Sequence, residues 1–311
     1  MRPLATAWIY EKCPRAMPQE PPQVMLGPAQ YGKAEVRVLH VDRTGPRHEI
    51  TDLNVTVTLA GDMADTYLTG DNSGVLSTDA QKNTVYAFAR SGVRPVEEFA
   101  LRLGRHFAQV GSVHRAQVRI EEYGWRRIDA AGGPHPHSFE RVAGTRIVSA
   151  CVHDDGRAEV VVGVDDLVLL KSTGSEFHGF LVDRYTTLEP TDDRILATAV
   201  AAQWRFAVNE ADWAECFRGA RTALAEAFAI THSLSLQQTL YAMGEAVLAA
   251  CSEVAEVRLS LPNKHHFLVD LGPFGLDNPG EVFYAADRPY GQIEGTVCRA
   301  GAPAGDPEHQ W

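Results

Sequence analysis

Val257-Arg258-Leu259-Ser260-Leu261-Pro262-Asn263-Lys264-His265-His266-Phe267 joins a strand pattern to a run of polar residues. Its apolar residues alternate with polar ones as far as Leu261, a pattern typical of a strand with one buried face. An amide, an amine and two imidazoles then follow where the strand should end. Alternation places Asn263 and His265 on the same face, about 7 Å apart. The sequence therefore predicts a strand end that presents polar groups to a small molecule.

Strands of this kind occur in pairs, with helices gathered between the pairs. The predicted strands span 34–41, 53–59, 116–120, 147–152, 159–164, 167–170 and 257–261. Apolar residues at helical spacing predict helices over 99–110, 213–228 and 236–251, with starts marked by Pro95, Asp212 and Ser233. The order of hairpin, helices and strands occurs twice. We therefore predict an α+β fold, an antiparallel β-sheet with helices on one face.

The repeat divides the chain into four segments. Residues 1–30 contain six prolines and little periodicity, so they are predicted to form a disordered arm. We predict a first domain over 31–140, a second over 141–299 and a flexible tail over 300–311. Within the repeats, residues 78–84 align loosely with residues 192–198.

Composition limits the classes of partner. The chain has 311 residues, 45% of them hydrophobic, and a formal net charge of −11. This acidic balance argues against nucleic acid or an anionic membrane as the main partner, because both require a basic surface. The sequence has neither an apolar run of roughly 18 residues nor the pattern of a secretory signal.

Cysteine usage and the C-terminus favour a cytoplasmic protein. The five cysteines are scattered without a Cys-x-x-Cys pair, and Cys216 and Cys251 fall on apolar helical stripes, so we expect a reducing compartment. The last residues, 308–311, are not a peroxisomal signal of the Ser-Lys-Leu type. We expect a cytoplasmic protein of bacterial origin.

Several ordered motifs resemble those of urate oxidases (uricases), enzymes that oxidise uric acid without a cofactor. The matching stretches are Tyr31-Gly32-Lys33, 77–84, 134–139, 170–173, 177–181, 183–188, 193–196, 235–239 and 261–265. The resemblance covers about residues 31–299. It implies tandem tunnelling-fold (T-fold) domains with outer helices, whose sheets close into a barrel only when subunits associate. It further implies a homotetramer with active sites at subunit interfaces.

By this resemblance, Lys33, Thr78 and His265 form a proton relay. A lysine stabilises a nearby anion, a threonine hydroxyl passes on a proton, and an imidazole titrates near neutrality. The expected reaction consumes urate, dioxygen and water and yields 5-hydroxyisourate and hydrogen peroxide, a step of purine breakdown. No cofactor is expected, and the sequence has no Gly-x-Gly-x-x-Gly or phosphate-loop motif.

The resemblance also implies a substrate-binding set. Arg194 offers a forked pair of donors to a purine anion, Gln237 an amide, and Phe177 a stacking surface. Asn263 is expected to hold dioxygen or water in turn. The remaining binding residues are Thr78, the bracing carboxylate Asp79, and the apolar walls Leu188 and Leu236.

Alternative interpretations remain for single residues and for the whole chain. In isolation Lys33 is a solvated strand residue, Thr78 a turn or cap residue, and Arg194 the partner of Asp192 or Asp193 in an ion pair. The pair His135-x-His137, with His153, His265 and His266, offers imidazoles, but the flanking prolines suggest a rigid loop and we expect no metal. Another T-fold purine or pterin enzyme, a metal-dependent hydrolase and a non-catalytic purine-binding protein stay open.

Overall fold

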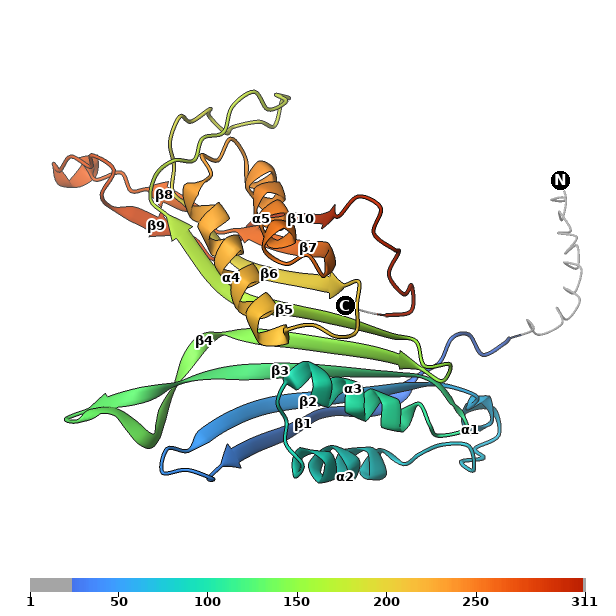
Figure 1. Ribbon diagram of the computed structural model, residues 1–311. Helices are drawn as coiled ribbons and strands as arrows, with labels where there is room; N and C mark the ends of the chain where they lie inside the picture. The colour runs from blue at the N-terminus through green and yellow to red at the C-terminus, as the bar shows by residue number, and fades with distance from the viewer. Residues whose placement is uncertain (1–23, 310–311) are drawn as a thin grey trace, which may run out of the picture.

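The computed structural model describes residues 24–309, which form one large antiparallel sheet. Its strand order is β1-β2-β3-β4-β5-β6-β7-β10, and every neighbouring pair is antiparallel (Figure 1). The strands are β1 (Tyr31–Asp42), β2 (Glu49–Gly61), β3 (Val113–Ala130), β4 (Gly133–His153), β5 (Ala158–Lys171), β6 (Leu196–Phe206), β7 (Val254–Asn263) and β10 (Gly291–Cys298). The predicted antiparallel α+β class is confirmed.

The helices and a small second sheet complete the described residues. The helices are α1 (Ala64–Leu68), α2 (Thr78–Ala89), α3 (Val96–Phe107), α4 (Trp213–Ile230) and α5 (Leu236–Ala250). Between β7 and β10, strands β8 (His266–Leu268) and β9 (Phe283–Ala285) pair around a 3-10 turn, Gly272–Phe274. Within residues 24–309, no helix combines the length and the hydropathy needed to span a bilayer.

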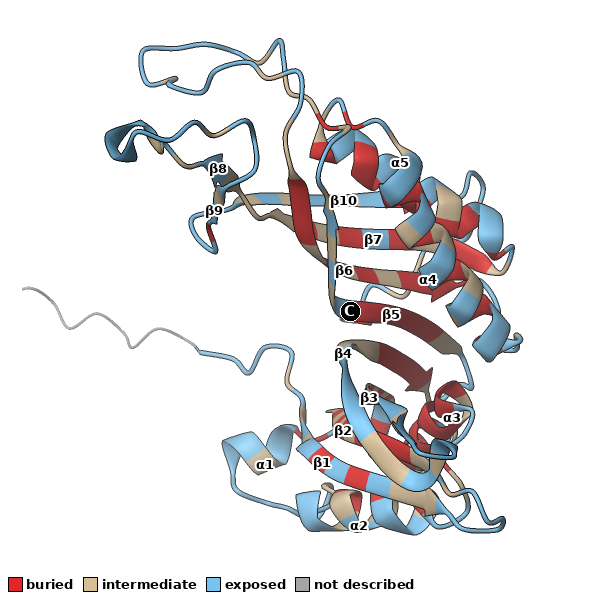
Figure 2. Ribbon diagram, turned by 90° about the vertical axis from the view of Figure 1, so that its left-hand side faces the viewer, coloured by how far each residue is buried: buried red, intermediate tan, exposed pale blue. Residues whose placement is uncertain are grey.

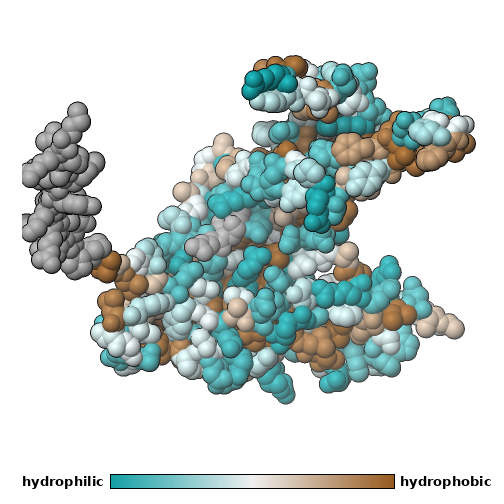
Figure 3. All heavy atoms as spheres, turned by 180° about the vertical axis from the view of Figure 1, so that it is seen from behind, coloured by the Kyte–Doolittle hydropathy of each residue, from teal (hydrophilic) through white to brown (hydrophobic). Residues whose placement is uncertain are grey.

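Helices α2 to α5 all cover the same face of the sheet (Figure 2). Alternation in β2 explains why, since Leu53, Val55, Val57 and Leu59 are fully buried against them. Among residues 24–309, no helix packs on the opposite face, and hydrophilic side chains occupy most of its centre (Figure 3). Burial on the helix-covered face is what the alternating sequence pattern predicts. On the opposite face, Ser149 and Cys151 of β4 are also buried, beneath the C-terminal tail.

The predicted repeat is visible as two successions of two strands, two helices and two strands. The first runs β1-β2-α2-α3-β3-β4 and the second β5-β6-α4-α5-β7-β10. The first strand of each is interrupted by a bulge with a non-glycine residue at positive φ, Glu35 at 57° and Asp166 at 53°. The expected boundary at 140/141 lies inside β4, so we propose that the two units meet in the turn 154–157.

Helix α2 was not predicted from the sequence. Only Gln81, Val85 and Ala89 are buried along it, so its apolar period is weak and its buried face includes an amide. The loose alignment of residues 78–84 with residues 192–198 is wrong, because the first range is helical and the second is a loop that enters β6.

The C-terminal tail differs from the flexible segment that we predicted, whereas the prediction for the N-terminal arm is not tested. Most of the arm, residues 1–23, lies outside the described residues, and residues 24–30 form no helix or strand. Residues 300–309 lie across the helix-free face, where Arg205 Nη2 donates to Pro303 O at 2.8 Å and the side chain of His309 is fully buried. Polar contacts hold this tail, which is why apolar periodicity does not reveal it.

A disulfide joins Cys216 on α4 to Cys251 at the end of α5, with Cα atoms 5.6 Å apart. Sequence analysis treated both cysteines as unpaired apolar residues of a reducing compartment. Their 35-residue separation gives no pairing signal, because the contact exists only once the two helices pack.

Candidate active site

Lys33 lies on the edge strand β1, immediately before the bulge. Glycine is required at the preceding position, since a Cβ on Gly32 would lie 1.8 Å from the carbonyl oxygen of Val57 on β2. The hydroxyl of Tyr31 donates to Leu76 O at 2.9 Å and ties the loop before α2 to this strand. These contacts fix the start of α2 beside Lys33.

Thr78 and Asp79 are the first two residues of α2, and both are exposed. The side chain of Ser77 caps the helix by accepting from Ala80 N at 3.1 Å. Hydrogen bonding and the charge of Lys82, and more weakly the charge of Lys33, lower the pKa of Asp79. Asp79 is therefore an ionised carboxylate near Lys33, and the structure brings together the three predicted residues of the first unit.

Arg194 lies in the loop before β6, partly buried, and burial lowers its pKa. Its guanidinium lies 5.1 Å from the ring centroid of Phe177. The Nε atom is buried and has no hydrogen-bond partner among the described residues. Such an unmet donor is costly unless a ligand satisfies it.

The neighbouring aspartates do not pair with Arg194. Asp192 contacts His178 Nε2 at 2.9 Å. Asp193 accepts from the Thr173 hydroxyl at 2.6 Å and from Gly174 N at 2.8 Å, and these hydrogen bonds lower its pKa. The ion-pair alternative is therefore not what forms, and Asp193 instead holds the loop that carries Phe177.

Phe177 is held in place by backbone and ring contacts. Its N–H donates to Thr191 O at 2.9 Å, and Thr191 N–H donates back at 3.2 Å. The ring of Phe180 stacks on it with centroids 5.1 Å apart and planes 11° from parallel. Sequence analysis did not select Phe180, although the Phe177-x-x-Phe180 spacing was available as a signal.

The start of α5 packs beside the same loop. Ser233 N–H donates to Gly174 O at 2.9 Å, and Glu176 N–H donates to Ser233 O at 2.8 Å. The helix is capped by Ser235 rather than by Ser233 as predicted, so Leu236 and Gln237 are its first two residues. Leu236 is buried and Gln237 is exposed, which leaves the amide of Gln237 available to a ligand.

Asn263 is the last residue of β7, paired with Thr198 on β6 and Gly291 on β10. His265 follows, and its carbonyl accepts from Ala286 N at 2.9 Å. Burial, the charge of Arg194 and the charge of His266 lower the pKa of His265. Its imidazole is therefore neutral at neutral pH and able to accept a proton.

Within one chain the predicted residues form two groups. Lys33, Thr78 and Asp79 belong to the β1 edge, whereas Phe177, Arg194 and His265 lie by β6 and β7, with Leu236 and Gln237 beside them. Six strand spacings separate β1 from β7, roughly 29 Å along the sheet. Leu188 is more than half exposed in the loop before β6. One chain does not assemble the full predicted site.

The histidine pair considered for metal binding lies in a strand, not in a rigid loop. Residues 134–139 belong to β4, in its hairpin with β3, where Pro134 pairs with Asp129. The rings of His135 and His137 are 4.4 Å apart. Among residues 24–309, neither belongs to a group of three metal-ligating side chains.

Comparisons with known proteins give the same family throughout. A family model described as Uricase matches residues 29–147 and 160–294. The uricases of Arthrobacter globiformis and Dictyostelium discoideum are 52% and 40% identical, over 92% and 87% of this chain and 93% and 96% of their own lengths. The crystal structure of Arthrobacter globiformis uricase matches with a TM-score of 0.88 at 51% identity, covering 92% of this chain and 99% of that chain. The T-fold expectation is thereby confirmed, and the chain belongs to the uricase family.

Proposed function

We propose that the protein oxidises urate with dioxygen and water to 5-hydroxyisourate and hydrogen peroxide. Urate is an electron-rich anion, and loss of a further proton lets it transfer an electron to dioxygen directly. The protein then has three tasks, which are to orient the purine, to remove its proton and to stabilise the anion.

The observation that carries this proposal is the set of groups around Arg194. The partly buried guanidinium of Arg194, whose buried Nε–H is unmet, lies over an aromatic ring and near a neutral imidazole. A planar anion satisfies these groups together, by accepting from the guanidinium and stacking on Phe177. Gln237 contributes an amide from the start of α5, and Leu236 and Leu188 contribute apolar walls.

The proton relay draws on both groups of residues. Lys33 and Thr78 on one subunit would face His265 of the next. The carboxylate of Asp79 would brace Lys33, whose charge acts on it. Asn263, at the end of β7, is the proposed position for dioxygen and then for the water that attacks the purine. The reaction balances: one molecule each of urate, dioxygen and water becomes one molecule each of 5-hydroxyisourate and hydrogen peroxide.

Association of subunits is part of the same proposal. Among the described residues, β1 and β10 each lack a partner on one side, so the sheet stays open at two edges. Edge pairing between copies would close a barrel and place the β1 group of one chain beside the β6 and β7 group of another. We propose a cytoplasmic homotetramer with its sites at these interfaces.

The decisive test is turnover by purified protein treated with chelator. Incubation with urate in air should consume the ultraviolet band of urate and release hydrogen peroxide in equal amounts. Binding of urate without release of hydrogen peroxide would indicate a non-catalytic purine-binding protein instead. Turnover of xanthine or a pterin, but not of urate, would assign the site to another T-fold enzyme.

A further inference from the structure

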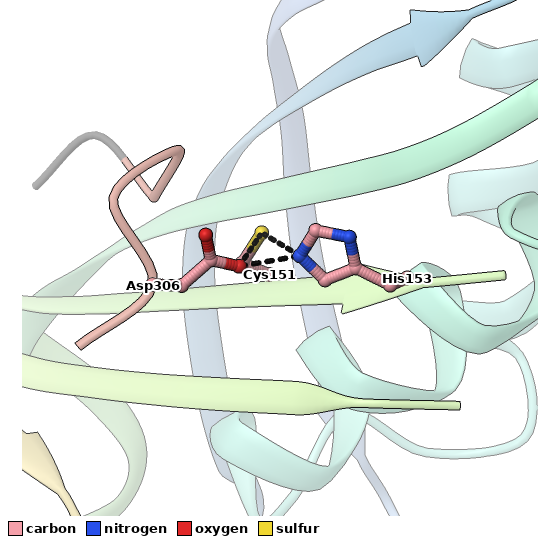
Figure 4. A group of neighbouring side chains, drawn as sticks. All are labelled: Cys151, His153 and Asp306. Carbon is pink, nitrogen blue, oxygen red and sulfur yellow. Dashed lines mark hydrogen bonds and ion pairs between the residues drawn. The ribbon is translucent and has the colours of Figure 1, made fainter. Parts of the chain in front are cut away.

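The helix-free face carries a second cluster of reactive side chains, far from the residues assigned to urate. Cys151 and His153 alternate on β4, so both project from the face opposite the core residues Ala150 and Val152. The C-terminal tail lays Asp306 against them (Figure 4). Nothing in the proposed oxidation uses this cluster.

The three ligand atoms converge on one point. Cys151 Sγ lies 3.9 Å from His153 Nε2 and 3.9 Å from Asp306 Oδ2, and the nitrogen and the oxygen are directly hydrogen-bonded. Ligand atoms around a tetrahedral zinc ion are separated by roughly 3.5 Å. Two edges of the triangle are therefore close to that spacing, and binding has to open only the contact between His153 and Asp306.

The geometry is that of a chelate and not of a cysteine nucleophile with its base. A catalytic histidine uses one ring nitrogen for the thiol and the other for the carboxylate. Here the same atom, His153 Nε2, faces both Cys151 and Asp306 (Figure 4). Burial, followed by the charge of Asp306, also raises the pKa of Cys151 to about 12, which is unsuited to a nucleophile.

Neighbouring contacts fix the third ligand and leave room for a fourth. Glu159 accepts from Asp306 N at 3.0 Å and pairs with His309 Nδ1 at 2.8 Å, so the tail is anchored on both sides of the carboxylate. A cavity of about 340 Å³ borders the cluster and is lined by His153, Arg157, Glu159, Asn209 and Asp306. This cavity gives an ion access and a water molecule a coordination position.

We propose that Cys151, His153 and Asp306 form a site for a zinc-class divalent cation, which fastens the C-terminal tail to β4. A thiolate, an imidazole and a carboxylate are together a donor set that suits zinc or cobalt(II), and the charges of a thiolate and a carboxylate balance the ion. All three residues lie outside the segments 29–147 and 160–294 that match the family model. The site is therefore a feature of this chain beyond its proposed oxidation chemistry.

Cobalt(II) titration of the full-length, chelator-treated protein tests the site directly. One equivalent per chain should bind with a thiolate-to-cobalt charge-transfer band, and zinc should displace it and raise the Tm. Cys151→Ser should abolish the band, and Asp306→Asn should weaken zinc binding by at least roughly 100-fold. The matched controls are Cys298→Ser, which removes an exposed thiol, and Asp155→Asn, which removes an exposed carboxylate of the adjacent turn.

Each outcome decides the proposal. A band that survives Cys151→Ser, or that disappears with Cys298→Ser, would overturn it, as would the absence of stoichiometric binding. Should Cys151→Ser fail to fold, Asp306→Asn still tests the site, because it changes only the tail. Urate oxidation after chelation is measured separately, so failure of the metal site leaves the proposed function intact and the reverse also holds.

Discussion

In the proposed proton relay, Lys33 and Thr78 act at the β1 edge, so their replacement should slow turnover more than binding. We expect Lys33→Met and Thr78→Ala each to lower kcat by about 10²- to 10⁴-fold with a small change in KM. Thr84→Ala is the matched control, because its hydroxyl bonds only to Ala80 O within the same helix. Steady-state kinetics with urate check the prediction, and wild-type kcat in both variants would remove these residues from the relay.

His265 should set the acid limb of the pH profile. Its pKa is lowered by burial, by Arg194 and by His266, so kcat/KM should fall only below the ordinary histidine value of about 6.5. Replacing His266 by Ala removes one positive neighbour, which makes protonation of His265 easier and moves the limb to higher pH. Neutral-pH kcat should stay near wild type in that variant.

The matching loss variant is His265→Ala. It should lower kcat at neutral pH and remove the acid limb altogether. An unchanged profile in His265→Ala would show that another group titrates.

Two serine caps position candidate residues at the scale of the element. Ser77 caps α2 directly before Thr78, and Ser235 caps α5 directly before Leu236. Ser77→Ala should cost about 1 kcal/mol of stability and also lower kcat, since the first turn of α2 loosens. Asp212→Ala, which removes the cap of α4, should cost a similar amount while kcat is retained. Thermal unfolding and kinetics on the same samples separate the two effects.

The disulfide between α4 and α5 makes a second prediction at this scale. Closing a loop of 35 residues contributes roughly 4 kcal/mol in the chain-entropy model. Protein purified without reductant should show three titratable thiols among its five cysteines after denaturation. Reduction should lower the Tm, whereas Cys298→Ser should leave it unchanged. Five titratable thiols would mean that the pair stays reduced.

The elements that could be predicted are those with a clear apolar period. Leu53 to Leu59 alternate and are buried, and α3 carries Phe99, Leu103 and Phe107 at helical spacing against the sheet. Helix α2 was missed because its buried face contains Gln81, and the tail was missed because Asp306 and His309 bind through polar groups. Periodicity reports burial of apolar side chains, so elements held by hydrogen bonds escape it.

At the scale of the whole molecule, a site shared between subunits should be restored by mixing two inactive chains. Lys33→Met and Arg194→Met lie in different groups, so each chain spoils a different half of the site. Random reassembly of equal amounts should recover about a quarter of wild-type activity, because half of the pairs are mixed and each mixed pair has one intact site. Reassembled single variants are the controls, and no recovery would contradict a site shared between subunits.

The resemblance to uricases selected Arg194, Phe177 and His265, and the structure gathers them. Periodicity alone could not show that Lys33 lies at the far edge of the sheet, because strand order depends on how the whole sheet assembles. The spacing of Phe177 and Phe180 was an available signal that was not used, whereas the anchoring role of Asp193 depends on how its loop folds.

The bulges at Glu35 and Asp166 occupy equivalent positions in the first strand of each unit, as expected if one repeated unit was fused into a single chain. A ring built from separate, identical units would have identical junctions, and every junction would carry the same side chains from both neighbours. Fusion breaks that equivalence, because the copies can then mutate independently. One copy can thereby supply Lys33 and Thr78 to the proposed site and the other Arg194, Phe177 and His265, a division that identical, unfused units could not make.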